Sequence, residues 1–341
     1  DTFGRIAKPD YMKYLFFIDG GALAVENGLK TAMDWKVRKN FARGMKEEKG
    51  HQVIHFREAF HGRSGYTLSL TNTFDPRKTK YFAKFDWPRI INPKITFPLN
   101  DENLERVKTL EEQAVEQINS AIAERGDDIC ALIIEPIQGE GGDNHFRLEF
   151  FKELERITRE NEIMFIVDEV QTGLGQTGKM WAIEHFGVRP DMIVFGKKTQ
   201  VCGFMSNKRI EENEDNVFTI SSRLNSTWGG NLVDMLRCKR YIEIIKQDNL
   251  VKNAAETGKY FLEMLGHIAQ NTGEISNVRG RGLFMAFDVK SPQRRDEIRM
   301  RCWENGFATL ACGETSVRLR PALIFKKKHV DEACRALLKS F

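Results

Sequence analysis

Three short segments of the 341-residue sequence contain residue types that could do chemistry, and each directly follows an apolar run. Asp19-Gly20-Gly21-Ala22 follows YLFFI, and glycines there would let the backbone N–H groups of a helix N-terminus bind a phosphate. Asp168 follows MFIV, and a carboxylate at a buried strand end needs a cationic partner, either a protonated ring nitrogen or an arginine. Lys197 follows MIVF and a glycine, where apolar surroundings favour a Schiff-base nucleophile, whereas Lys198 is interpreted as an ordinary exposed lysine.

Taken together, the three segments match the requirements of pyridoxal 5′-phosphate (PLP). The phosphate would bind at the glycine turn, and the acid would keep the pyridine nitrogen protonated. The lysine would form a Schiff base with the aldehyde and later move a proton. Taken singly, each segment also has a plain structural interpretation, as a tight turn, a structural ion pair or a surface lysine.

Two further motifs carry less weight. Gly173–Gly178 (GLGQTG) has the GxGxxG spacing, but a dinucleotide fingerprint should follow its strand at once and open a helix, and Asp168–Thr172 intervene. A nicotinamide or flavin enzyme is therefore a disfavoured alternative. His51 and His55 have a spacing that suits a metal only on a helix. Their segment is typical of a strand, where they would lie about 13 Å apart, so we expect no metal site.

The elements that must position these residues follow from the apolar runs. Continuous apolar runs indicate strands that are buried on both faces, and helical patterns between them indicate an α/β fold with a mainly parallel sheet. Polar residues at the carboxyl ends of such strands, here Asp19, Glu135, Asp168 and Lys197, are the first candidates for a ligand site. The expected strands are Tyr14–Ile18, Gln52–Phe56, Ala131–Ile134, Met164–Val167 and Met192–Phe195, and the expected helices are Ala22–Arg38, Glu102–Glu124 and Leu148–Glu160.

The pattern changes after about residue 228. Two long helices are predicted there, followed by an alternating strand and a further short strand: Asn231–Asp248, Val251–Gln270, Leu283–Val289 and Val317–Leu319. We therefore predict a large domain over residues 1–227 and a smaller α+β domain over residues 228–341.

Composition excludes several classes of protein. Lys plus Arg (52) nearly balance Asp plus Glu (48), so the net charge of +4 gives no reason to expect a nucleic acid or an anionic membrane as partner. No apolar run approaches the length of about 18 residues that a membrane-spanning helix needs. The first ten residues lack the pattern of a signal peptide. Six scattered cysteines without a CxxC pair indicate reduced thiols and a cytoplasmic protein.

Beyond these physical arguments, six longer words of the sequence resemble the class III aminotransferases of PLP fold type I. They are GGALAVEN (20–27), FHGRSGYTLSLTNT (60–73), EPIQGEGG (135–142), DEVQTG (168–173), FGKK (195–198) and STWGGN (226–231). Narrower words resemble the lysine 6-aminotransferases within this class: KFDWPRI (84–90), GKKTQVCG (196–203) and SRLNSTWGGN (222–231). The resemblance extends over nearly the whole chain, and it implies the fold type I large domain with a smaller C-terminal α+β domain.

The resemblance assigns cofactor-binding roles to eight positions. It implies that Gly21 and Ala22 bind the PLP phosphate through backbone N–H groups, that Phe60 and Val170 cover the two faces of the ring, that Asp168 pairs with the ring nitrogen, that Gln171 binds the ring hydroxyl, that Lys197 forms the Schiff base, and that Thr227 reaches the phosphate of the neighbouring subunit's cofactor. The role of Thr227 implies a homodimer with shared sites.

The resemblance also implies the substrates. Arg63 would pair with a substrate carboxylate, and Arg318 would hold the α-carboxylate of glutamate or 2-oxoglutarate, with Arg320 as the alternative. Glu140 would pair with this arginine while lysine is bound. The expected reaction moves the ε-amino group of L-lysine to 2-oxoglutarate and gives 2-aminoadipate 6-semialdehyde and L-glutamate.

The beginning of the sequence departs from the class. A longer segment usually precedes the glycine turn, and only 19 residues precede Gly20 here. We expect this segment to supply early strands, a dimer contact and part of the substrate pocket. Two alternatives stay open: another class III ω-aminotransferase, acting on ornithine, acetylornithine or 4-aminobutyrate, and a non-catalytic protein that keeps the fold as a binding surface.

Overall fold

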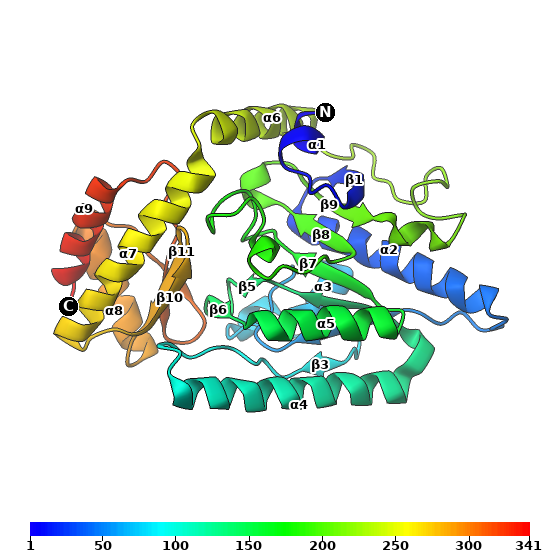
Figure 1. Ribbon diagram of the computed structural model, residues 1–341, viewed down its shortest axis with the longest axis horizontal. Coiled ribbons are helices and arrows are strands. Elements are labelled where there is room, and N and C mark those ends of the chain that lie inside the picture. Colours follow the sequence, from blue (N-terminus) through cyan, green and yellow to red (C-terminus); the bar gives the residue numbers. More distant parts are fainter.

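The computed structural model describes residues 1–341, in which helices pack on both faces of a seven-stranded sheet beside a smaller antiparallel sheet (Figure 1). The seven strands have the order β1-β9-β8-β7-β4-β2-β3. They are β1 (Met12–Ile18), β2 (Gln52–Phe56), β3 (Arg89–Ile90), β4 (Ile129–Ile134), β7 (Met164–Asp168), β8 (Met192–Phe195) and β9 (Cys202–Asn207). Strands β3, β2, β4, β7 and β8 run parallel, and β9 is antiparallel to both of its neighbours. The predicted α/β fold with a mainly parallel sheet is therefore confirmed.

Helices on both faces explain the continuous apolar runs. In β7, Ile166 packs into the core on the side of α2 (Gly21–Ala42), whereas Phe165 and Val167 pack into the core on the side of α5 (Leu148–Glu160). Helix α4 (Asp101–Arg125) contributes to the same core as α5. Successive side chains of a strand point to opposite faces, so a strand covered on both faces needs apolar residues at every position.

The sequence analysis missed strand β9, which lies between β1 and β8 near the edge of the sheet (Figure 1). Its sequence, CGFMSN, contains a glycine and polar residues that weaken the strand pattern. The glycine is required by packing: a Cβ on Gly203 would lie only 2.0 Å from the carbonyl oxygen of Phe16 in β1. The close approach of two backbones thus requires a glycine where an apolar side chain would have made the strand recognisable in the sequence.

A second sheet forms the C-terminal part of the chain, with the order β10-β11-β13-β12 and antiparallel pairing throughout. Its strands are β10 (Ser276–Arg281), β11 (Phe284–Asp288), β12 (Leu310–Cys312) and β13 (Ser316–Leu319), and the helices packed with it are α7 (Leu250–Thr272), α8 (Pro292–Glu304) and α9 (Lys327–Leu338). Helix α6 (Leu232–Gln247) precedes them and packs against the core of the large sheet. The predicted division at residues 227 and 228 stays a prediction.

Short elements connect these bodies. They are α1 (Thr2–Ile6), α3 (Gly65–Leu70), the hairpin strands β5 (Ile137–Gln138) and β6 (Asn144–His145), and the 3₁₀ turns η1 (Pro76–Lys78), η2 (Gly126–Asp128), η3 (Ala182–His185), η4 (Lys197–Thr199) and η5 (Lys208–Glu212). No helix opens at the Gly173–Gly178 motif, which lies in consecutive turns. None of the helices has an apolar stretch long enough to cross a bilayer.

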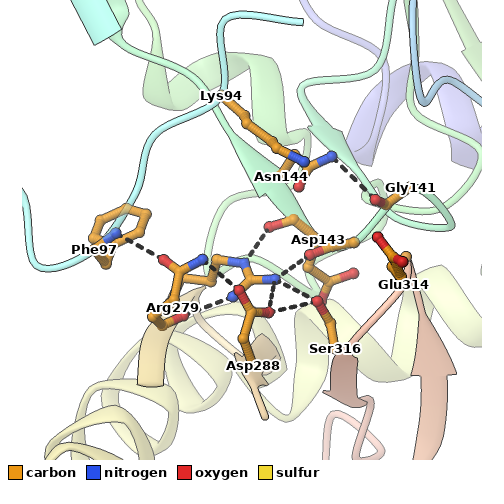
Figure 2. Close-up of polar contacts among 12 residues, drawn as sticks. Lys94, Phe97, Gly141, Asp143, Asn144, Arg279, Asp288, Glu314 and Ser316 are labelled. Atoms are coloured by element: carbon orange, nitrogen blue, oxygen red, sulfur yellow. Dashed lines mark hydrogen bonds and ion pairs between the residues drawn. The ribbon is translucent and has the colours of Figure 1, made fainter. Parts of the chain in front are cut away.

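A buried arginine fastens the small sheet to the β5–β6 hairpin. Arg279 of β10 donates to the carbonyl oxygen of Asp143 at 3.1 Å and to that of Gly142 (Figure 2). The same guanidinium donates to Asp288 Oδ1 at 2.8 Å and to Ser316 Oγ at 2.9 Å. These hydrogen bonds join the hairpin loop to β11 and β13 through one buried side chain, which holds the loop against the small sheet.

Candidate active site

Seven of the eight predicted cofactor residues meet at the carboxyl ends of the central strands, and Thr227 does not. A cavity of about 730 Å³ lies there. Of the predicted residues, it is lined by Gly21, Ala22, Phe60, Arg63, Asp168, Val170, Gln171 and Lys197. Arg318, Glu140 and Thr227 are not part of this lining.

The part of the cavity predicted to bind a phosphate is the turn between β1 and α2. Gly20 has φ +98°, a conformation that favours glycine, and helix α2 begins at Gly21. The first backbone hydrogen bond of the helix runs from Ala24 N to Gly20 O, so the N–H groups of Gly21 and Ala22 have no partner within the helix. A Cβ on Gly21 would lie 3.1 Å from Val170 Cγ1, so the turn packs closely on the loop after β7.

Asp168 ends strand β7 and is 4% exposed. Its Oδ1 accepts from the Val170 N–H at 3.0 Å, and its Oδ2 accepts from His61 Nδ1 at 2.8 Å. The protein partner of the carboxylate is thus a histidine and not the arginine that we considered. Sequence reasoning missed His61, although it stands beside Phe60 in the word FHGR.

Glu135, at the end of β4, has a structural part in the same wall of the cavity. Its Oε1 accepts from the Phe60 N–H and its Oε2 from the Gly139 N–H, each at 3.0 Å. Complete burial raises the pKa of this carboxyl to about 7, and the nearby His61 partly offsets the rise. Glu135 therefore links the loop of Phe60, which lines the cavity, to the loop of Gly139.

The two consecutive lysines lie in different surroundings. Lys197 begins the 3₁₀ turn η4 after Gly196, has φ +53°, and extends its side chain into the cavity. The side chain of Lys198 is half-buried, and its ammonium group donates to the carbonyl oxygen of Gln171. Burial, with the nearby cations Arg320 and Lys197, lowers the pKa of Lys198 to about 7. The interpretation of Lys198 as an exposed lysine was wrong, because η4 turns its side chain inward.

The two candidate arginines of β13 also differ in their partners. Arg320 forms an ion pair with the buried Asp143 and lies over the ring of Phe284. Arg318 has only a weak contact, from Nη1 to Gln171 Oε1 at 3.4 Å, and its buried Nε has no partner. Of the two guanidinium groups, that of Arg318 is available for a ligand.

Glu140 and Arg63 are the remaining residues that we expected to contact the substrate. The carboxylate of Glu140 is paired with Lys78 and Thr73 and not with Arg318. Arg63 lines the cavity and forms no ion pair. Thr227 lies in an exposed segment, which is joined to the β1–α2 turn by the hydrogen bond from Asp19 N to Gly229 O at 3.2 Å.

This arrangement fits PLP. Free N–H groups at a helix N-terminus suit a phosphate, a buried carboxylate suits a protonated ring nitrogen, and an amine reaches the same cavity. An aromatic ring, Phe60, and an aliphatic side chain, Val170, line the same cavity and could cover the two faces of a flat ring.

Comparisons with known proteins agree with this assignment. The family model described as aminotransferase class-III matches residues 4–341. L-lysine-epsilon aminotransferases of Mycobacterium bovis and Streptomyces clavuligerus are 46% and 45% identical to this chain, over 99% of this chain and 74% of each relative. The solved structure of lysine aminotransferase from M. tuberculosis in the internal aldimine form matches with a TM-score of 0.97 and 46% identity, over 100% of this chain and 78% of that chain. The chain therefore belongs to the class III aminotransferase family.

Proposed function

We propose that this protein is a PLP-dependent L-lysine 6-aminotransferase. It moves the ε-amino group of L-lysine to 2-oxoglutarate and gives L-glutamate and 2-aminoadipate 6-semialdehyde, which cyclises to a piperideine carboxylate. One observation carries the proposal: a single cavity joins the α2 N-terminus, Asp168 and Lys197 in a chain that is 46% identical to proteins named L-lysine-epsilon aminotransferase.

The cofactor would be held by the residues that line the cavity. The N–H groups of Gly21 and Ala22 would bind the phosphate, where the positive end of the α2 dipole favours an anion. Phe60 and Val170 would contact the two faces of the ring, and Gln171 would bind the ring hydroxyl. These groups would fix the plane of the ring between the wall formed by Phe60 and the loop after β7.

PLP supplies an aldehyde that exchanges amino groups and a pyridine ring that accepts electrons. Asp168, fixed by His61 and by the Val170 N–H, would keep a proton on the ring nitrogen and so strengthen the electron withdrawal. Lys197 would be the residue that binds the aldehyde covalently. Its free amine would act as the general base and accept a proton from the carbon that bears the substrate amine.

Carboxylate recognition would decide which amino group of lysine enters. Arg63 binds the α-carboxylate of lysine, so that the ε-amine faces Lys197. Arg318, whose guanidinium has a free edge, binds the α-carboxylate of 2-oxoglutarate or glutamate in a planar pair. Glu140 compensates the charge of Arg318 while lysine, which has only one carboxylate, occupies the cavity.

A homodimer would complete the site. Large apolar side chains are exposed next to Thr227, and Trp228, Leu232, Val233 and Leu236 are each at least 66% exposed. A monomer rarely exposes such a cluster, and a second copy of the chain would cover it. In that dimer Thr227 would reach the partner's cofactor phosphate.

The six cysteines are all unpaired and support a reducing cytoplasmic location.

A comparison of amine donors tests the proposal. The purified protein with PLP and 2-oxoglutarate should form glutamate fastest with L-lysine, and trapping of the cyclised product should show that the ε-amine was removed. Ornithine, acetylornithine and 4-aminobutyrate are the competing donors. A higher kcat/KM for any of these would replace lysine as the assigned donor, and no turnover with any amine would favour the non-catalytic alternative.

A further inference from the structure

The carboxylate of Glu140 is held by residues that are not among the proposed catalytic or cofactor-binding residues. Glu140 Oε1 accepts from Thr73 Oγ1 at 2.7 Å and from the ammonium group of Lys78. Thr73 lies just before η1, and Lys78 is the last residue of η1. Lys78 also lies 5.9 Å from the centre of the Phe60 ring, so it is next to the cavity without lining it.

Another cation near this loop is Arg318. The side chain of Gln171 separates the two: a Cβ on Gly139, the residue before Glu140, would lie 2.2 Å from Gln171 Oε1, to which Arg318 Nη1 donates at 3.4 Å. One buried polar atom on each side has no partner, Oε2 of Glu140 and Nε of Arg318. A buried acceptor or donor without a partner costs free energy, so a hydrogen bond between Glu140 and Arg318 would be favourable.

The backbone of Glu140 is fixed, so any exchange of partners must use its side chain. Its carbonyl oxygen accepts from the Gly313 N–H at 2.8 Å. Three residues later in the same loop, Arg279 donates to the carbonyl oxygen of Asp143 (Figure 2). A carboxylate on a backbone held in this way can change partners only by rotating its side chain.

We propose that Lys78, together with Thr73, is a specificity-determining residue that holds the Glu140 carboxylate away from Arg318. This position leaves Arg318 free for the second carboxylate of a dicarboxylic substrate. The inference rests on the proposed function, in which a dicarboxylate and a diamine with one carboxylate share the site. Loss of Lys78 favours the position on Arg318 and thereby weakens the binding of the dicarboxylate alone.

The test uses Lys78→Met, which keeps an apolar stem and removes the charge. Lys78 and Glu140 are partly exposed, with side chains 31% and 19% accessible, so we expect the dissociation constant for a dicarboxylate to rise by about three- to tenfold. The probe is glutarate, which has neither an amine nor a keto group, titrated calorimetrically into the protein with bound PLP. Lys78→Arg should restore wild-type binding, and the matched control Lys80→Met, on an exposed neighbouring lysine, should leave it unchanged.

Two further measurements separate the proposal from its alternatives. The concentration dependence of the half-reaction with L-lysine should be unchanged or shifted to lower concentration in Lys78→Met. In a Glu140→Gln background, Lys78→Met should have no further effect on glutarate binding. Equal weakening for lysine and glutarate, no change for glutarate, or a persistent effect in Glu140→Gln would each overturn the proposal. A wild-type protein that binds glutarate but does not react with lysine would refute the proposed donor, and the glutarate titrations would still test Lys78.

Discussion

The hydrogen bond between His61 and Asp168 offers a quantitative test of how this chain prepares its cavity for a ring nitrogen. The Asp168 carboxylate is 4% exposed and has two donors, His61 Nδ1 at 2.8 Å and the Val170 N–H at 3.0 Å. An ionised carboxylate only accepts hydrogen bonds, so the proton of the pair is on Nδ1. Replacing His61 by Phe keeps a flat ring of similar size and removes this donor.

The expected magnitude follows from the burial of the pair. A hydrogen bond to a charged group contributes about 1.5–3 kcal/mol, and the lost donor leaves Oδ2 unpaired where little water can replace it. The substitution also removes His61 Nε2, a buried atom without a partner, which offsets part of the loss. The change in the free energy of unfolding of His61→Phe alone therefore mixes two effects. A double-mutant cycle with Asp168→Ala isolates the pair, and we expect a coupling energy of about 1.5–3 kcal/mol.

Urea unfolding of the wild type, the two single variants and the double variant, all without cofactor, measures this coupling. The same four proteins should differ in affinity for PLP, with His61→Phe about tenfold weaker than wild type because the carboxylate is less well fixed. A coupling energy below about 0.5 kcal/mol would refute the reasoning, since two groups in a buried hydrogen bond cannot act independently. The value would then be that of an exposed pair.

Three other predictions concern single residues. Lys197→Ala should abolish turnover while the protein still binds PLP, and turnover in that variant, measured as glutamate formation, would exclude Lys197 as the general base. Arg318→Met should weaken glutarate binding without a large change in unfolding free energy, whereas Arg320→Met should cost about 3–5 kcal/mol, because it leaves the buried Asp143 unpaired. Titration and urea unfolding measure the two effects. If Arg320→Met weakened glutarate binding and Arg318→Met lowered the free energy of unfolding, Arg320 would be the ligand-binding residue and Arg318 the structural one. Burial lowers the pKa of Lys198 to about 7. Between pH 7 and about 10 the Lys198 amine therefore carries a proton only in the unfolded chain. The free energy of unfolding should then rise with pH, by up to about 1.4 kcal/mol per pH unit. Urea unfolding of Lys198→Met should show a smaller slope, and an identical slope would contradict the assignment.

Much of the fold could be predicted because the parallel strands are covered on both faces. Burial on both faces demands apolar residues at every position, and the runs MFIV in β7 and MIVF in β8 have them. Strands β9 and β10 were missed for the opposite reason. Gly203 in β9 allows two backbones to touch, and β10 has the polar sequence SNVRGR. Tertiary contacts, not local propensity, determine both strands.

The candidate site divides in the same way. Asp168, Lys197 and the glycine turn could be found because each interrupts an apolar run at a strand end. His61, Thr73 and Lys78 lie in loops, and their partners Asp168 and Glu140 are more than sixty residues away in the sequence. No periodicity connects such residues. The inward turn of Lys198 depends on the backbone of η4, where Lys197 has positive φ.

The central claim, that this chain accepts the ε-amine of lysine, is tested most directly by the half-reaction. The protein with PLP is mixed with L-lysine alone, without a keto acid, and the yellow absorbance of the bound cofactor is followed. The account predicts rapid conversion to the absorbance of pyridoxamine phosphate with lysine and little conversion with ornithine. A yellow protein that lysine leaves unchanged, or one that ornithine converts faster, would contradict it.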